Sequence, residues 1–127
     1  MATERPLSPH LGIWRWRVHM LVSILHRATG DGLAIVGGGL LLWWLVALAS
    51  GPEAYAGFLE CAGGWLGKLV FVGLTFALYQ HMLSGIRHLA MDTGWGYALT
   101  TSRLTAILTM LGSIALTGAT WAIILYA

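Results

Sequence analysis

The chain has 127 residues, of which 57% are hydrophobic and only 9% are charged. Soluble domains carry about a quarter charged residues, so this chain is too poor in charge to cover a water-facing surface and is predicted to lie in lipid. The net charge of +2, spread over scattered basic residues, excludes the basic stripe of a nucleic-acid-binding protein. The single cysteine, Cys61, excludes an internal disulfide and any zinc or iron–sulfur site built on cysteine pairs.

Residues 1–19 form a polar N-terminal segment without the apolar stretch of a cleavable signal. Three runs without charge follow, at 32–52, 69–86 and 104–127. A helix needs about 20 apolar residues to cross roughly 30 Å of hydrocarbon, and each run meets or nearly meets that length. The sequence therefore predicts an all-α membrane protein with one transmembrane anchor domain over 1–127 and helices at about 20–50, 64–90 and 103–126.

The basic residues predict how these helices are oriented. Arginines occur in the N-terminal segment, at the start of the first helix and around the second connection, whereas the first connection holds Glu53, Glu60 and only Lys68. Because an excess of Lys and Arg marks the cytoplasmic side, the N-terminus is predicted to be cytoplasmic and the C-terminus periplasmic. This arrangement, without a transit peptide, favours the inner membrane of a bacterial cell.

Polar residues cluster at the cytoplasmic end of the first helix. Ser23 and Arg27 are four residues apart and share a face, and His26 is three residues after Ser23. This hydroxyl, imidazole and guanidinium suit a quinone carbonyl or a propionate group. The alternative is a basic helix end with a solvated arginine, and the pattern leaves both open.

A second cluster lies on the second helix. His81 and His88 are seven residues apart, so they project from one face about 10 Å apart along the axis. Gly85 lies between them and is expected to leave a flat strip for a planar macrocycle. By the same helical rise per residue, His81 lies about 9 Å deeper in the membrane than Arg87, within the hydrocarbon layer.

A neutral imidazole at that depth is a natural axial ligand of haem iron, against the alternative of a hydrogen-bonded core histidine. A low-spin haem b needs two axial ligands, and His81 is the only histidine deep in a predicted span. The second ligand is therefore expected from another chain, so the chain is predicted to be half of a haem-binding helical bundle.

Three motifs at their observed spacing resemble the cytochrome b subunit of succinate dehydrogenase, the larger membrane anchor of respiratory complex II. They are RPLSPHL at 5–11, SILHR at 23–27 followed by Thr29-Gly30, and H-x3-G-x-R-H-x3-D from His81 to Asp92. Trp14 stands where the first motif expects an aromatic residue. The resemblance, with its three spans, size and order of motifs, covers most of the chain.

The resemblance implies a complex with a second small three-helix anchor subunit, an iron–sulfur subunit and a flavoprotein subunit. Electrons from succinate would pass through FAD and iron–sulfur clusters in those partner subunits to ubiquinone, within the tricarboxylic acid cycle and respiratory electron transport. The chain would catalyse nothing alone. An anchor of a quinol:fumarate reductase and a haem-free structural anchor are the alternatives.

The resemblance also implies roles for single residues. His81 would be an axial ligand of the iron of haem b, with the partner anchor supplying the other ligand. Ser23 and Arg27 would help bind the quinone, while His26, Arg27 and His88 would lie near the haem propionates. Asp31, four residues after Arg27, could pair with it.

Overall fold

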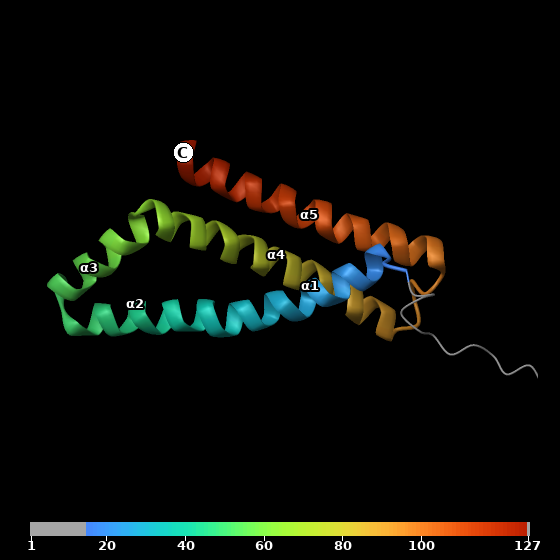
Figure 1. The fold of residues 1–127 in the computed structure, drawn as a ribbon, viewed down its shortest axis with the longest axis horizontal. Helices are drawn as coiled ribbons and strands as arrows, with labels where there is room; N and C mark the ends of the chain where they lie inside the picture. Colours follow the sequence, from blue (N-terminus) through green and yellow to red (C-terminus); the bar gives the residue numbers. More distant parts are fainter. Residues whose placement is uncertain (1–14, 127) are drawn as a thin grey trace, which may run out of the picture.

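The computed structural model describes residues 15–126, and these residues are almost entirely helical (Figure 1). The motif at 5–11 and Trp14 lie outside the described residues. The elements are α1 (Val18–Gly32), a short π-helical segment η1 (Leu33–Gly37), α2 (Gly38–Ser50), α3 (Pro52–Gly63), α4 (Trp65–Asp92) and α5 (Leu99–Tyr126).

Within the described residues, three helices are long and apolar enough to cross a membrane: Val18–Ser50, Trp65–Asp92 and Leu99–Tyr126. The first has 33 residues, because α1, η1 and α2 continue into one another without a break. At 1.5 Å per residue it is about 50 Å long, which exceeds the hydrocarbon thickness and allows a tilt. The prediction of an all-α protein with three transmembrane helices is confirmed.

The first connection contains a helix, which the sequence interpretation did not expect. Gly51 ends α2 with a φ of 112°, and α3 then begins with Pro52 at its first position and Glu53 in its first turn. Both residues suit a helix start, since proline has no N–H to leave unpaired and the carboxylate faces the positive end of the helix dipole. Phe58 of α3 is buried against Trp43, with ring centroids 4.9 Å apart in a T-shaped pair.

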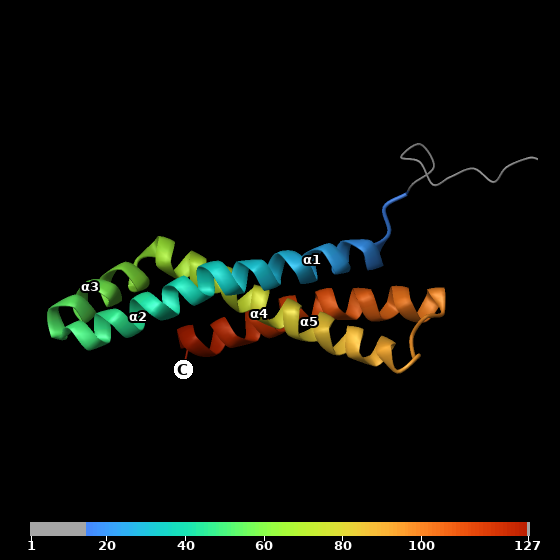
Figure 2. The same ribbon diagram turned by 90° about the horizontal axis from the view of Figure 1, so that it is seen from below.

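The spans run side by side, and α4 packs against both α1 and α5. Figures 1 and 2 show the start of α1, the end of α4 and the start of α5 at one end of the molecule, whereas α3 lies at the other end. Near α3, α2 diverges from α4. The residues at the start of α1 and the end of α4 are thereby brought together.

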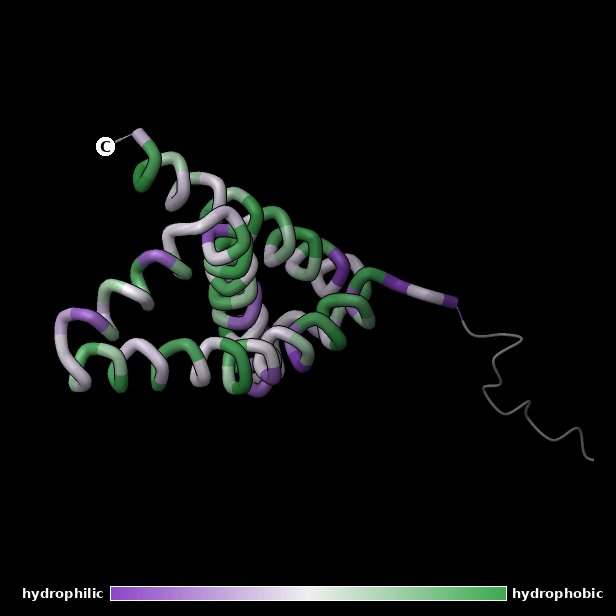
Figure 3. The backbone as a smooth tube through the Cα atoms, turned by 60° about the vertical axis from the view of Figure 1, so that its left-hand side comes forward, coloured by the Kyte–Doolittle hydropathy of each residue, from purple (hydrophilic) through white to green (hydrophobic). Residues whose placement is uncertain are grey.

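The interior of the bundle is built from small and polar side chains. The buried residues of α5 recur every three or four positions and face α4: Ser102, Ala106, Thr109, Ser113 and Thr117. Small residues let two helices approach closely in lipid, where apolar side chains gain nothing by leaving the solvent. Large apolar side chains instead cover the outside, and apolar residues extend along all the spans (Figure 3).

Candidate functional site

Two histidines from different helices lie in direct contact where α1 crosses α4. The imidazole rings of His26 on α1 and His81 on α4 stack with centroids 4.1 Å apart and planes 7° apart. His81 Nδ1 also lies 3.0 Å from the backbone carbonyl oxygen of His26. The side chain of His81 is thus held by α1 on one ring face and at one ring nitrogen.

This hydrogen bond determines the tautomer of His81. A carbonyl oxygen can only accept, so Nδ1 must carry the proton, and in the neutral ring Nε2 then bears a free lone pair. Nε2 makes no hydrogen bond within the part of the chain that the structure describes. A histidine that binds a metal typically donates its other ring N–H to a carbonyl in this way.

The carbonyl of His26 accepts a second hydrogen bond. Thr29 Oγ1 donates to the carbonyl oxygens of Leu25, at 2.6 Å, and of His26, at 3.1 Å. Thr29 is buried, so its hydroxyl depends on these acceptors. The His26 carbonyl therefore interacts with its own helix through Thr29 and with α4 through His81.

Gly30 is the reason that α1 can approach His81. A Cβ atom at this position would lie 2.9 Å from Cε1 and 3.2 Å from Nδ1 of His81. Any other residue would push the imidazole away from the helix. Gly30 belongs to the second motif, but what it faces cannot be deduced from the motif.

His88 completes a group of three imidazoles. Its ring centroid is 5.1 Å from that of His26, with planes inclined by 54°. His26 thus lies between the two histidines of α4, and its Cε1 atom is 3.6 Å from where a Cβ of Gly85 would be. The expectation of an open strip at Gly85 is therefore wrong, because the imidazole of His26 on α1 covers this position.

The two residues expected to bind quinone lie on the outer surface of α1. Ser23 and Arg27 are exposed, and neither makes a hydrogen bond or ion pair with another described residue. Arg27 and Asp31 do not form an ion pair either. The structure thus brings His26, His81 and His88 together, whereas Ser23 and Arg27 face outward about one turn apart on the same helix.

Within residues 15–126, no group of three or more histidine, cysteine or acidic side chains could hold a metal ion by itself. His26 Nδ1 is buried and has no hydrogen-bond partner among these residues. The cluster thus combines His81, whose Nε2 makes no hydrogen bond to a described residue, with His26, whose buried Nδ1 has no partner among those residues.

Arg87 has a role that the sequence did not reveal. Its side chain is 7% exposed and turns toward α5, where Nε donates to Thr105 Oγ1 at 3.0 Å and Nη2 donates to Ser102 Oγ at 2.9 Å. The sequence places Arg87 in the third motif, next to the basic second connection, but does not show its partners, because the hydroxyls that accept its hydrogen bonds lie 15 and 18 residues away. This arginine links α4 to α5 beside His88.

A second polar link joins the same helices deeper in the bundle. Ser113 Oγ donates to Gln80 Oε1 at 2.8 Å, and both side chains are fully buried. Gln80 precedes His81 directly, so this bond restrains the rotation of α4 that presents His81 to α1. Gln80 Nε2 and Ser84 Oγ are buried nearby without a partner among the described residues.

Comparison with known proteins identifies related chains. Residues 1–120 match the family described as succinate dehydrogenase/fumarate reductase transmembrane subunit. The chain is 37% identical over 113 residues to the succinate dehydrogenase cytochrome b556 subunit of Paracoccus denitrificans, covering 89% of this chain and 86% of the relative.

Similar proteins occur in other organisms. The cytochrome b556 subunit of Rickettsia felis is 35% identical over 118 residues, which cover 93% of this chain and 91% of the relative. The mitochondrial succinate dehydrogenase cytochrome b560 subunit of Sus scrofa is 39% identical over 127 aligned positions, which cover 91% of this chain and 72% of the relative.

Proposed function

The chain belongs to the succinate dehydrogenase/fumarate reductase transmembrane subunit family, and on that premise we propose that it is the cytochrome b anchor of a succinate dehydrogenase. In this role it holds haem b together with a second anchor subunit and helps to form the site of ubiquinone reduction. The relatives named as cytochrome b subunits of succinate dehydrogenase support this proposal over a quinol:fumarate reductase anchor.

The single observation that carries the haem assignment is the hydrogen bond between His81 Nδ1 and the His26 carbonyl. It leaves Nε2 of His81 with a free lone pair, which is the state that a histidine needs to bind haem iron. Bound haem supplies a one-electron carrier within the membrane. The partner anchor subunit would provide a second iron ligand, because His81 is the one histidine within residues 15–126 that makes this hydrogen bond.

Three further side chains suit the haem propionates. His26 and His88 lie within 5.1 Å of each other by ring centroids, and the buried Nδ1 of His26 has no partner among the described residues. Protonated imidazole nitrogens donate hydrogen bonds to carboxylates. Arg27, the neighbour of His26, stays charged and binds carboxylates in a bidentate manner. We assign these three residues to the propionate end of the haem.

Ser23 and Arg27 are assigned to the quinone. Ser23 donates a hydrogen bond to a quinone oxygen, and Arg27 stabilises the negative charge that builds on that oxygen during reduction. Their outward position on α1 supports a site completed by other subunits. Electrons from succinate would arrive through FAD in the flavoprotein subunit and through clusters in the iron–sulfur subunit, so this chain would catalyse nothing alone.

The placement of basic residues supports the orientation of the complex. The start of α1, the end of α4 and the start of α5 share one end of the molecule and carry most of the arginines (Figure 1). The positive-inside rule assigns that end to the cytoplasm and the end of α5 to the periplasm of a bacterial inner membrane. Soluble subunits that oxidise succinate would then bind at the cytoplasmic end.

The haem assignment is tested by a reduced-minus-oxidised spectrum of the purified complex. The wild-type complex should show a b-type band, and His81→Ala should lose it. Met82→Ala, which changes the neighbouring residue on the outer face of α4, should keep it. A wild-type complex without a b-type band would instead establish the haem-free anchor.

The quinone assignment is tested by two assays on the same preparation. Ser23→Ala and Arg27→Leu should each slow ubiquinone reduction while succinate oxidation by an artificial soluble acceptor stays intact. Ser50→Ala, an exposed serine at the far end of the first span, should change neither rate. Equal loss of both activities in the Ser23 and Arg27 variants would indicate misassembly and refute the assignment.

A further inference from the structure

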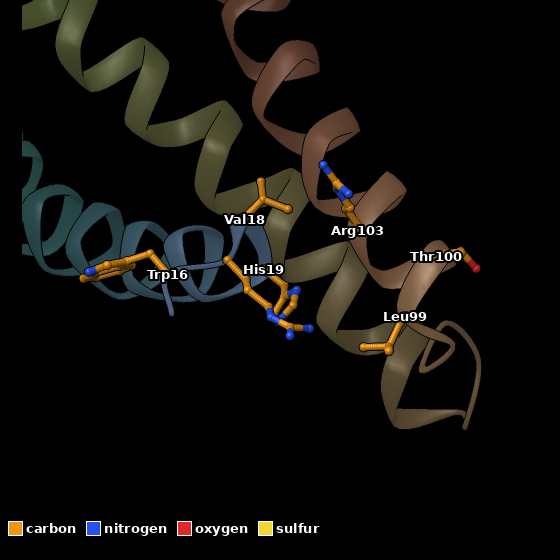
Figure 4. A pocket seen from close by; sticks show the side chains of 7 residues that line it. Trp16, Val18, His19, Leu99, Thr100 and Arg103 are labelled. Carbon is orange, nitrogen blue, oxygen red and sulfur yellow. The ribbon is translucent and has the colours of Figure 1, made fainter. Parts of the chain in front are cut away.

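A second polar feature lies apart from the histidine cluster, at the edge of the membrane spans. A pocket of about 460 Å³ opens between the start of α1 and the start of α5. One side of the pocket is lined by the start of α1 and the two residues before it, and the other side by the start of α5 (Figure 4). The lining residues are Trp16, Arg17, Val18, His19, Leu99, Thr100 and Arg103. Neither the haem nor the quinone assignment uses any of these residues.

The lining of this pocket is positively charged. Arg17, which directly precedes α1, and Arg103 of α5 both line it, and none of the seven described residues that line it is acidic. The first turn of α5 also lines the pocket. Its backbone N–H groups come before the first helical hydrogen bond, which runs from Ser102 N to Ala98 O. Such N–H groups and the helix dipole both favour an anion.

His19 adds a polar atom that lacks a partner. Its Nδ1 is buried and makes no hydrogen bond within residues 15–126. A buried ring nitrogen without a partner is costly, so a ligand that pairs with it gains affinity. Because His19 lines the pocket together with two arginines, that ligand is expected to carry acceptor oxygens.

The apolar part of the lining indicates what the anion is attached to. Val18 and Leu99 are the first residues of two membrane spans, so the pocket lies where the headgroup layer meets hydrocarbon. Trp16 also lines the pocket, and tryptophan side chains favour this interface. A ligand with a phosphate at one end and an apolar body at the other matches both halves of the lining.

We propose that this pocket binds the phosphate of an anionic phospholipid, with Arg17 and Arg103 on the phosphate oxygens, His19 as a further polar contact, and Val18 and Leu99 against the glycerol and upper acyl chains. The lipid ties the first and third spans together at the positively charged edge. The assignment does not depend on haem or quinone binding.

The proposal is tested by native mass spectrometry of the purified complex, titrated with phosphatidylglycerol or with zwitterionic phosphatidylcholine. The wild type should retain one phosphatidylglycerol more tightly than phosphatidylcholine. The double variant Arg17→Gln/Arg103→Gln should bind it roughly 30-fold more weakly, given about a fivefold contribution from each basic residue near anionic lipid. Arg15→Gln/Lys68→Gln removes the same charge outside the pocket and should bind as the wild type does.

Three results would overturn the proposal. Equal loss in both double variants would show that net charge alone attracts the lipid. Full displacement of phosphatidylglycerol by millimolar inorganic phosphate would indicate a site for a soluble anion. A cross-link to the iron–sulfur subunit from a photoreactive group attached to Thr100→Cys, with no retained lipid, would assign the pocket to a protein contact.

Discussion

The ring of His81 is held by the backbone of His26, through a 3.0 Å contact between Nδ1 and the carbonyl oxygen, while the two imidazoles stack 4.1 Å apart. Backbone and side chain of His26 therefore have separable roles. The carbonyl sets the tautomer of His81, and the imidazole covers Gly85 and carries the unsatisfied Nδ1.

Substitution of the His26 side chain should therefore leave the haem in place. His26→Phe keeps the carbonyl and an aromatic ring against His81, so the purified complex should retain its b-type band. The loss of one proposed propionate contact should lower haem affinity and shift the midpoint potential, measured by redox titration. Complete loss of the band in His26→Phe, as in His81→Ala, would contradict the division of roles.

Gly30→Ala should weaken the contact between α1 and His81 by steric overlap. The new Cβ would lie 2.9 Å from Cε1 of His81, and overpacking of this kind costs about 1–3 kcal/mol. The complex should unfold at a lower temperature and show a weaker b-type band. Gly32→Ala is the matched control on α1, since a Cβ there meets nothing within 4 Å. It should be stabilising by up to about 1 kcal/mol through helix propensity.

Arg87→Met should loosen α4 from α5. It removes the bonds to Thr105 and Ser102 and leaves two hydroxyls without their donor, at a cost of about 1–3 kcal/mol. Arg87→Lys should rescue little, because an ammonium cannot reproduce the planar fork. Thermal unfolding of the detergent-solubilised complex measures the effect. Lys68→Met, an exposed cation on the same helix, should change the midpoint little, and an equal effect there would refute a specific role for Arg87.

Gln80 and Ser113 should be energetically coupled. Ser113→Ala leaves the fully buried Gln80 Oε1 without its donor and should cost about 1–2 kcal/mol. Gln80→Met removes the polar group, so the double variant should be less destabilised than the sum of the two single variants, by about 0.5–1 kcal/mol. Additive effects in this double-mutant cycle would show that the bond contributes nothing to stability.

Several features of this protein follow from the sequence alone. Runs of about 20 residues without charge have one stable conformation in lipid, because a helix satisfies every backbone group internally. The three spans could therefore be predicted from composition and length. The periodicity of the helix likewise places His81 and His88 on one face of α4, and the spacing of the motifs indicates the family.

Other features required the tertiary structure, because they depend on how far apart the helices lie and how each is rotated. No local pattern shows that Arg87 reaches hydroxyls on α5, that Gly30 faces His81, or that His26 covers Gly85. These contacts join residues 15 to 59 positions apart. The sequence determined which side chains enter the membrane, and the packing of α4 between α1 and α5 decided which of them meet.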